Sequence, residues 1–393
     1  MRYMKSAFVA CFVCFIAFVG LSTIAGRNDW SPTEGRTLNQ FPGLAYSRLG
    51  DVAYLNKITN AFSDQISGRE RKIALYNDMM VNVLGQKWVG SVAVGKEKQL
   101  YQEPEVITDE KAYEREVIRC AEIVNREAAK VVKSGTRFIY INYPRKDVAV
   151  SEFLPDFYLD SRKDYEKYIS IMKSHLSEDV TFIDAYDILK TPKGSSASEQ
   201  RYYSNDHHVN FQGQMLIYQK LMSLVQEEFP DVRVCQLSDF HMEESVVNGS
   251  FNRRLGYAVS SREEVLQVQP KEPWNYVRKD RKTAIFGRGK DYARAFMGGD
   301  FANTVVVASK DGKKGNSALP KIFISGSSYT NSLEALCVGS FRSMHSVDYR
   351  SNKSGKTVAD YVEKEKPDYV VYIPNQSDRH FSYEMFQLHL GLK

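Results

Sequence analysis

The sequence predicts an α/β protein in which a parallel sheet is covered by helices on both faces and is preceded by a single membrane-spanning helix. Two observations lead to this prediction. Beyond residue 110, short and continuously apolar segments alternate with amphipathic helical segments, which is typical of buried parallel strands joined by crossover helices. Residues 7–26 carry no charge. A helix of this length rises about 30 Å, which is enough to cross the hydrocarbon core of a bilayer.

The composition of the 393-residue chain narrows its possible classes. Apolar residues make up 43% and charged residues 26%, which excludes a disordered polymer. The 53 Lys and Arg against 48 Asp and Glu leave a net charge of only +5, so the charge does not favour a nucleic-acid-binding protein. Aromatic residues reach 12%, which suits a large core or a surface that is partly apolar and partly wet.

The apolar run at the N-terminus is expected to be a signal-anchor. Arg2 and Lys5 precede it, so residues 1–6 should stay in the cytoplasm and the rest of the chain should be exported. The alternative is a cleaved signal peptide with Ala25 as its last residue, but Thr23 and Ala25 match a cleavage site poorly. We therefore expect a single-pass protein of the cytoplasmic membrane, with its globular part on the extracytoplasmic side.

The five cysteines form no framework. Cys11 and Cys14 lie in the apolar run, which leaves Cys120, Cys235 and Cys337 for the exported part. Three distant cysteines allow at most one disulfide and make no metal-binding pair. The sequence does not decide whether such a bond forms.

The segment after the anchor is expected to be irregular. Residues 27–60 predict a stalk or entry segment. The helix breakers that suggest this are Pro32, Gly35, Pro42 and Gly43. Residues 61–393 are then expected to form the globular domain.

The globular part is predicted from its apolar spacing and its β-forming runs. Helices are expected over 53–85 with an interruption near Gly68, and over 112–135, 163–177 and 211–228. A hairpin is expected over 91–101, and strands over 137–143, 180–184, 303–309, 321–325 and 368–373. The long, irregular and polar stretch 231–300 predicts an insertion or lid beside the sheet.

Reactive side chains follow several of these strands. Ligands of a parallel sheet bind beyond the carboxyl ends of its strands. Gly326, Ser327 and Ser328 follow the strand 321–325, and the loop after 180–184 reaches the sequence Asp206-His207-His208. The sequence therefore places a serine and a histidine pair on one rim of the sheet.

A serine in this position could be a nucleophile. It needs a base that takes its proton and an acid that orients the base. A tight turn at Gly326 would expose Ser328 at the start of a helix. The alternative is an ordinary turn in which Ser327 or Ser328 caps the helix.

The histidine pair offers the matching base. Asp206 and His208 are two residues apart, so in an extended segment their side chains point the same way. His208 could then be the base and Asp206 the residue that orients it. A metal site made of Asp206, His207 and His208 is an alternative, although no second ligand cluster is evident. A polar loop with hydrogen-bonded histidines is the third.

These residues resemble a known family. Asp-His-His before a helix, and Gly-x-Ser-Tyr after a later strand, are similar to the DHHW, or AlgX/AlgJ-like alginate O-acetyltransferase, branch of the SGNH hydrolase superfamily. The resemblance extends along most of the exported chain. The further similar segments are GRTLNQFP (35–42), SDQISGRER (63–71), VAVGKEKQLY (92–101), YPRKDVAVSEFLP (143–155), FMGGDFANTVVV (296–307) and SVDYR (346–350).

The resemblance implies an SGNH-like, flavodoxin-like fold and a role for each matching residue. Ser328 would be the nucleophile, His208 the base and Asp206 its partner. The candidates for substrate or oxyanion contacts are Arg350, Asn375, Tyr329 and Gly326, with Asp300 as a weaker one. Aromatic residues beside these positions would line a wet cleft that stacks on sugars: Tyr202, Tyr203, Phe211, Tyr329 and Tyr349.

Two positions depart from the family. Val209 stands where the family usually has Trp, and Ser327 stands where Asp is frequent. Neither change removes a member of the triad, but both affect the surroundings of the site.

The function implied by the resemblance is transfer of an acetyl group, through an acyl-serine, to hydroxyls of an exported polysaccharide. The implied partners are this polysaccharide and a multi-spanning membrane acyltransferase that delivers the acetyl group. Neither a cofactor nor a metal is expected. The same triad would serve an esterase or deacetylase, and a non-catalytic polysaccharide-binding assembly subunit is the third hypothesis.

Overall fold

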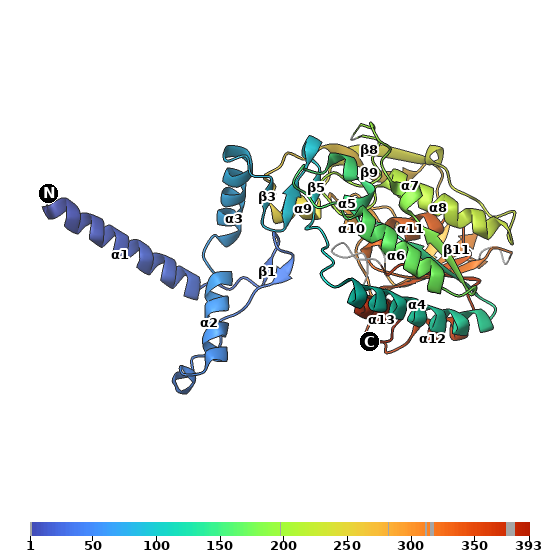
Figure 1. Cartoon of the computed structure of the whole chain (residues 1–393), viewed down its shortest axis with the longest axis horizontal. Helices are drawn as coiled ribbons and strands as arrows, with labels where there is room; N and C mark the ends of the chain where they lie inside the picture. The colour runs from blue at the N-terminus through green and yellow to red at the C-terminus, as the bar shows by residue number, and fades with distance from the viewer. Residues whose placement is uncertain (1, 197, 282, 311–312, 315–317, 375–381) are drawn as a thin grey trace. The chain divides into compact units, whose positions relative to one another are not determined.

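The computed structural model of the chain describes residues 2–196, 198–281, 283–310, 313–314, 318–374 and 382–393. These residues form two compact units (Figure 1). The first comprises Met1–Ser91 and Asn252–Ser260, and the second comprises Val92–Phe251 and Ser261–Lys393. The division into a stalk and a globular domain at residue 61 stays a prediction.

The first unit is mainly helical. Its elements are α1 (Arg2–Ile24), β1 (Trp30–Ser31), β2 (Arg36–Thr37), η1 (Tyr46–Arg48), α2 (Val52–Asp64), α3 (Arg69–Asp78), the π-helical turn η2 (Met79–Val83) and β3 (Trp88–Val89). The part of α1 from Ser6 to Ile24 is long and apolar enough to cross a membrane. Gly68 separates α2 from α3 with a φ of 67°, in the left-handed region that favours glycine. The interruption that the sequence predicts near Gly68 is therefore confirmed.

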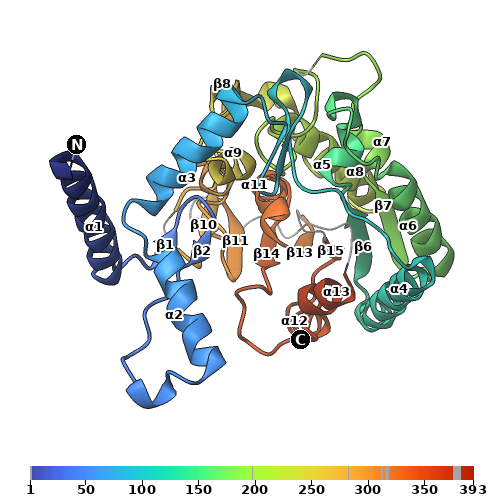
Figure 2. The same ribbon diagram turned by 60° about the vertical axis from the view of Figure 1, so that its left-hand side comes forward.

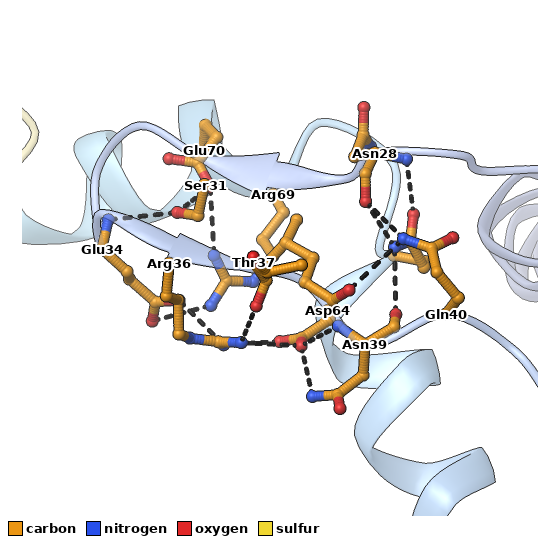
Figure 3. Close-up of polar contacts among 12 residues, drawn as sticks. Asn28, Ser31, Glu34, Arg36, Thr37, Asn39, Gln40, Asp64, Arg69 and Glu70 are labelled. Atoms are coloured by element: carbon orange, nitrogen blue, oxygen red, sulfur yellow. Dashed lines mark hydrogen bonds and ion pairs between the residues drawn. The ribbon is translucent and has the colours of Figure 1, made fainter. Parts of the chain in front are cut away.

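A polar network joins the segment after α1 to the junction between α2 and α3 (Figure 3). Arg36 donates two hydrogen bonds to the Asp64 carboxylate, at 2.8 and 2.7 Å. The backbone and side-chain amides of Asn39 also donate to Asp64, at 2.8 and 2.7 Å. Nearby, the Gln65 side chain accepts from the Asn28 N–H at 2.9 Å and donates to the Asn28 carbonyl at 2.8 Å. Two of the family-like segments, 35–42 and 63–71, thus contact each other.

A mixed sheet forms the centre of the second unit (Figure 2). Its strands include β6 (Arg137–Asn142), β7 (Val180–Asp184), β10 (Tyr276–Arg278), β11 (Asn303–Lys310), β13 (Lys321–Ser325), β14 (Ser343–Val347) and β15 (Tyr369–Tyr372). They lie in the order β10, β11, β14, β13, β15, β6, β7, and β12 (Lys313–Lys314) pairs with β11. The strands from β14 to β7 run parallel, which confirms the predicted sheet.

One edge of the sheet departs from the prediction. β11 pairs antiparallel with β14, and β10 pairs antiparallel with β11. We predicted from the sequence that residues 303–309 form one of the parallel strands, and this prediction of the strand direction is wrong. The connection from β11 to β13, between Lys310 and Lys321, is too short for the crossover that joins two parallel strands, which needs about a dozen or more residues. The two strands therefore run in opposite directions.

Helices cover both faces of the sheet (Figures 1 and 2). The helices that pack against α4 (Glu110–Lys133) are α6 (Arg162–His175), α12 (Val358–Glu365) and α13 (Tyr383–His389). The helices α8 (Phe211–Gln226) and α11 (Asn331–Cys337) pack against each other. Phe138 and Tyr140 of β6 join the core that includes α4, while Ile139 and Ile141, which alternate with them, are also buried. Burial on both faces explains why the strand is apolar throughout.

The stretch 231–300 contains more regular structure than the sequence predicted, although irregular segments lie between its elements. It contains η5 (Leu237–Asp239), β8 (Phe240–Val246), α9 (Ser250–Arg254), β9 (Glu263–Pro270), β10 and α10 (Tyr292–Ala295). β8 and β9 form an antiparallel pair. Most of β8 is exposed, so its sequence lacks the apolar run that reveals a buried strand. Its function as a lid stays a prediction.

Shorter elements complete the second unit. They are β4 (Val92–Val94), η3 (Lys96–Lys98), β5 (Leu100–Tyr101), α5 (Lys146–Ala149), η4 (Ser151–Phe153), α7 (Tyr186–Leu189) and η6 (Ser328–Thr330). β4 and β5 pair antiparallel, which confirms the predicted hairpin. Cys120, Cys235 and Cys337 are buried and free, so no disulfide joins them.

The polar network of the first unit generates a stability prediction. The hydrogen bonds from Arg36 hold the pKa of the Asp64 carboxyl below its usual range, although burial opposes them. This stabilisation is present above the carboxyl's unfolded pKa and is lost as the pH falls toward its folded value. Asp64→Asn removes the charge that Arg36 pairs with, and it should lower the local opening free energy of residues 28–40 by about 2 kcal/mol at pH 7. Hydrogen exchange of the full chain measures this value.

The matched control is Ser63→Ala, which changes an exposed neighbour on α2. It should leave the exchange of residues 28–40 unchanged. Equal exchange in Asp64→Asn and in the unmodified chain would contradict a stabilising role of the network.

Candidate active site

Ser328 lies just beyond a central strand of the sheet. β13 runs between β14 and β15 and ends at Ser325, and the chain then turns through Gly326 and Ser327 into η6 and α11. A Cβ atom on Gly326 would lie 2.4 Å from the Thr330 side chain, so only glycine fits this turn. The close turn is what brings Ser328 to the carboxyl end of the sheet.

Asp206 and His208 belong to a closed turn that precedes α8. Tyr202 and Val209 form an isolated antiparallel bridge, and inside it the Tyr203 N–H donates to the His208 carbonyl at 3.2 Å. Asn210 then caps α8 by accepting from the Gly213 N–H at 2.9 Å. A backbone bridge therefore closes the turn, and the Asn210 side chain fixes the start of the helix that follows it.

The structure brings Ser328 and Asp206 within hydrogen-bond distance of the two ring nitrogens of His208. His208 Nε2 lies 2.9 Å from Ser328 Oγ, and His208 Nδ1 lies 2.6 Å from Asp206 Oδ1. The exposed fractions of the three residues are 8%, 7% and 4%. This geometry allows the imidazole to take the hydroxyl proton while the carboxylate holds the ring in place.

The Asp206 carboxylate is well supplied with donors. Its Oδ1 also accepts from the His208 N–H at 2.9 Å, and its Oδ2 accepts from the Ser250 N–H at 2.6 Å. Burial by itself would raise the pKa of Asp206, but the charges of His207 and His208 and these hydrogen bonds hold it well below its usual range. The carboxylate is therefore ionised and able to stabilise an imidazolium.

Two supporting residues come from the stretch 231–300, and the sequence analysis missed both. Ser250 donates to Asp206 as described, and its hydroxyl lies 2.7 Å from His207 Nδ1. The Tyr292 ring stacks on the His208 ring at 4.0 Å between centroids, with an angle of 12° between the planes. The Tyr292 hydroxyl also accepts from the Ser332 N–H of α11 at 3.2 Å, so one side chain connects the base to the helix that follows Ser328. No local signal in the sequence marks either residue.

Tyr329 and Gly326, the candidates for substrate or oxyanion contacts next to Ser328, lie in the site. Their groups already contact other parts of the protein. Tyr329 packs against the rings of both His207 and His208, and its hydroxyl donates to the His207 carbonyl at 3.0 Å. The Gly326 N–H donates to the Val347 carbonyl at 3.3 Å and is therefore already engaged. Tyr329 buttresses the histidines, and Gly326 provides the turn.

Arg350 lies in an ion-pair cluster. It pairs with Asp348, with its Nη2 2.6 Å from a carboxylate oxygen, and lies 3.7 Å from Asp300. Asp300 accepts from the Asn331 side chain of α11 at 2.7 Å. The structure thus connects Arg350, through Asp300, to the helix after Ser328, and its guanidinium faces the carboxylates of Asp348 and Asp300. Asn375 lies outside the described residues.

The prediction that aromatic side chains around the site form a cleft for stacking on sugars is wrong. The five side chains are all less than one-tenth exposed: Tyr202, Tyr203, Phe211, Tyr329 and Tyr349. They are core residues whose rings are enclosed by the protein, so they offer no surface on which a sugar could stack.

The metal alternative can be compared with this geometry. Asp206, His207 and His208 each offer a ligand atom, and these atoms lie within 4.8 Å of one another. However, Nε2 of His208 faces Ser328, and both oxygens of Asp206 accept hydrogen bonds. The donors and acceptors already match one another, which favours a hydrogen-bonded triad.

Comparisons with known proteins agree with the fold. No protein-family model matches the chain, and no curated protein matches it. Among solved structures, the chain is similar to PatB1 of Bacillus cereus with a sulfonyl adduct, at 17% identity over 76% of this chain and 99% of that chain, with a TM-score of 0.60. A second PatB1 structure gives 18% identity, coverages of 75% and 98%, and a TM-score of 0.58.

A DHHW family protein from Eubacterium siraeum DSM 15702 is also similar, at 17% identity over 72% of this chain and 93% of that chain, with a TM-score of 0.52. These likenesses show a shared fold. They support, at the level of structure, the resemblance to the DHHW branch.

The geometry predicts a large effect of Asp206→Asn. The substitution keeps the shape of the side chain but removes the charge that orients and stabilises the His208 ring. The rate at which Ser328 reacts with phenylmethanesulfonyl fluoride should fall about a thousandfold or more. Intact-mass spectrometry over time measures this rate.

Asp187→Asn is the control, because Asp187 is an exposed carboxylate on α7. Its rate should match that of the unmodified chain. If Asp206→Asn retained more than a tenth of the rate, Asp206 would not be part of the reacting unit.

Proposed function

We propose that this protein is an extracytoplasmic O-acetyltransferase that moves an acetyl group, through an ester on Ser328, to hydroxyl groups of an exported polysaccharide. The observation that carries the proposal is the pair of hydrogen bonds on the His208 ring, 2.9 Å to Ser328 and 2.6 Å to Asp206. The polysaccharide acceptor rests on the sequence resemblance to the alginate group.

In the first half-reaction His208 takes the proton of Ser328 while Oγ attacks the carbonyl carbon of the donor. The bond from Oγ to the acetyl carbon forms, the bond to the leaving group breaks, and His208 returns the proton to that group. Asp206 stabilises the imidazolium in between. Backbone N–H groups of the turn around Ser328 would face the oxyanion.

In the second half-reaction a sugar hydroxyl takes the place of the leaving group. His208 removes its proton, the hydroxyl oxygen forms a bond to the acetyl carbon, and the bond from that carbon to Ser328 Oγ breaks. His208 then passes the proton from the sugar hydroxyl to Ser328 Oγ. The burial of the triad favours transfer over hydrolysis, because an enclosed acyl-serine is protected from bulk water. Esterase or deacetylase activity uses the same residues and is the alternative.

The apolar helix of the first unit supports a proposal for the location of the protein. We propose that α1 anchors the chain in the cytoplasmic membrane and that a multi-spanning membrane acyltransferase supplies the acetyl group. Large apolar side chains beyond α1 are exposed on the first unit, which supports a position at a membrane or a membrane protein. The most exposed of them are Leu44, Tyr46, Val52, Leu75 and Val83.

The test is product analysis with the full chain in nanodiscs. With an acetyl-ester donor and an added acidic or neutral glycan, we expect an acetyl group on the peptide that carries Ser328 and then on the glycan. Ser328→Ala should abolish both. Ser327→Ala, which removes only the neighbouring hydroxyl, should keep the acetyl group on Ser328.

Three outcomes separate the alternatives. Acetate released at the same rate with and without glycan would identify an esterase. Acetylation of the glycan by Ser328→Ala at the unmodified rate would refute the nucleophile. Glycan binding without an acetylated peptide would identify a non-catalytic subunit.

A further inference from the structure

Lys146 is completely buried beside the turn that carries Asp206 and His208. Its Nζ donates to the Tyr203 carbonyl at 2.7 Å and to the Ser204 carbonyl at 2.6 Å. Burial of a lysine costs free energy unless its ammonium is matched by acceptors. The triad does not use this side chain, and the family-like segment 143–155 gave it no role.

The carbonyls of Tyr203 and Ser204 lie at the start of the turn that carries Asp206 and His208. The Tyr203 carbonyl also accepts from the Asp206 N–H at 3.5 Å, and the Ser204 carbonyl accepts from the Leu100 N–H at 2.8 Å. Lys146 supplies the second donor to each of them. The ammonium therefore joins the loop after β6 to the segment that leads into Asp206.

The rest of the Lys146 environment also suits a cation. Its Nζ lies 5.2 Å from the centre of the Tyr101 ring and 5.8 Å from that of Phe251. The charged groups that act on it are the Glu264 and Asp206 carboxylates and the Arg262 guanidinium.

Glu264 holds the same turn from another side, because it accepts from the Ser204 N–H at 3.0 Å and from the Ser204 hydroxyl at 2.6 Å. On the helix of Lys146 itself, Arg145 and Asp147 pair with each other at 2.9 Å. The nearest charges of α5 therefore satisfy one another, and the ammonium faces the turn.

We propose that Lys146 is a positioning residue, whose ammonium group holds the turn from Tyr203 to His208 so that the imidazole meets Ser328. The proposal rests on the proposed function only in taking Ser328 as the nucleophile. It assigns Lys146 no contact with the substrate.

The charge of Lys146 depends on the pH, so the proposal can be tested by measuring the reactivity of Ser328 at different pH values. Burial lowers the pKa of Lys146 to about 7, although the charges of Glu264 and Asp206 oppose this shift. Above this pH the amine has lost its charge, and hydrogen bonds from an uncharged donor are about half as strong. The contribution of Lys146 to the reactivity of Ser328 should therefore be largest at acid pH and weaken as the pH rises through about 7.

The experiment uses phenylmethanesulfonyl fluoride and the full chain in nanodiscs between pH 5.5 and 9. Ser328 Oγ forms a bond to sulfur, the bond from sulfur to fluorine breaks, fluoride leaves, and the proton passes to His208. The reaction needs neither the acetyl donor nor a glycan, so its result stays readable even if the proposed transfer activity is wrong.

The variant is Lys146→Met, which keeps a long unbranched side chain without the ammonium. At pH 6 it should react about tenfold more slowly than the unmodified chain, the effect expected for a charge-assisted hydrogen bond. At pH 9 the difference should shrink to about threefold, because the unmodified lysine is then uncharged and its hydrogen bonds are about half as strong.

Three outcomes would overturn the inference. Equal rates at pH 6 would show that the ammonium is not needed. A rate reduced by one constant factor at every pH would show a structural role alone. A complete absence of sulfonylation at Ser328 would refute the nucleophile and, with it, the positioning of its base.

Two further measurements apply if Lys146→Met does not fold. The unmodified chain alone should show a rate that passes through a maximum and falls above about pH 7, and a steady rise to a plateau would contradict the inference. Lys146→Arg keeps its charge throughout and should lose that fall on the alkaline side.

Discussion

The site depends on one histidine ring that must keep two hydrogen bonds at the same time. His208 reaches Asp206 on one side and Ser328, 120 residues further along the chain, on the other. A shift of about 1 Å in either partner would break one of these hydrogen bonds, because the distance between donor and acceptor can vary by only a few tenths of an ångström. The surrounding structure can be understood as the means of holding these two distances.

The two sides are held in different ways. Ser328 is fixed by the sheet, since β13 lies between parallel neighbours and Gly326 permits only a close turn. Asp206 and His208 lie on a turn outside the sheet, and side chains hold it in place. Tyr292 stacks on the ring, and Lys146 holds the backbone carbonyls. A buried carboxylate would otherwise tend to take up a proton, so the donors around Asp206 are also needed for its charge.

The sequence predicted what local patterns encode. β7 and β13 have the predicted bounds, because buried parallel strands are short apolar runs. The sequence could single out Ser328, His208 and Asp206 as candidates, because the spacing of a few residues and their place after strands are local features. Ser250 and Tyr292 were not singled out, since their contacts with the site come from a segment without apolar periodicity and depend on tertiary structure. The aromatic residues beside the triad were misinterpreted for a related reason, because composition does not distinguish an enclosed ring from an exposed one.

The central claim is that Ser328 is the nucleophile and His208 its base. Its most direct test is a crystal structure of the chain after reaction with phenylmethanesulfonyl fluoride. The account predicts a covalent bond from Ser328 Oγ to sulfur, with His208 Nε2 still beside that oxygen and Nδ1 still bonded to Asp206. An adduct on a different side chain, or a His208 ring turned away from Ser328, would contradict it.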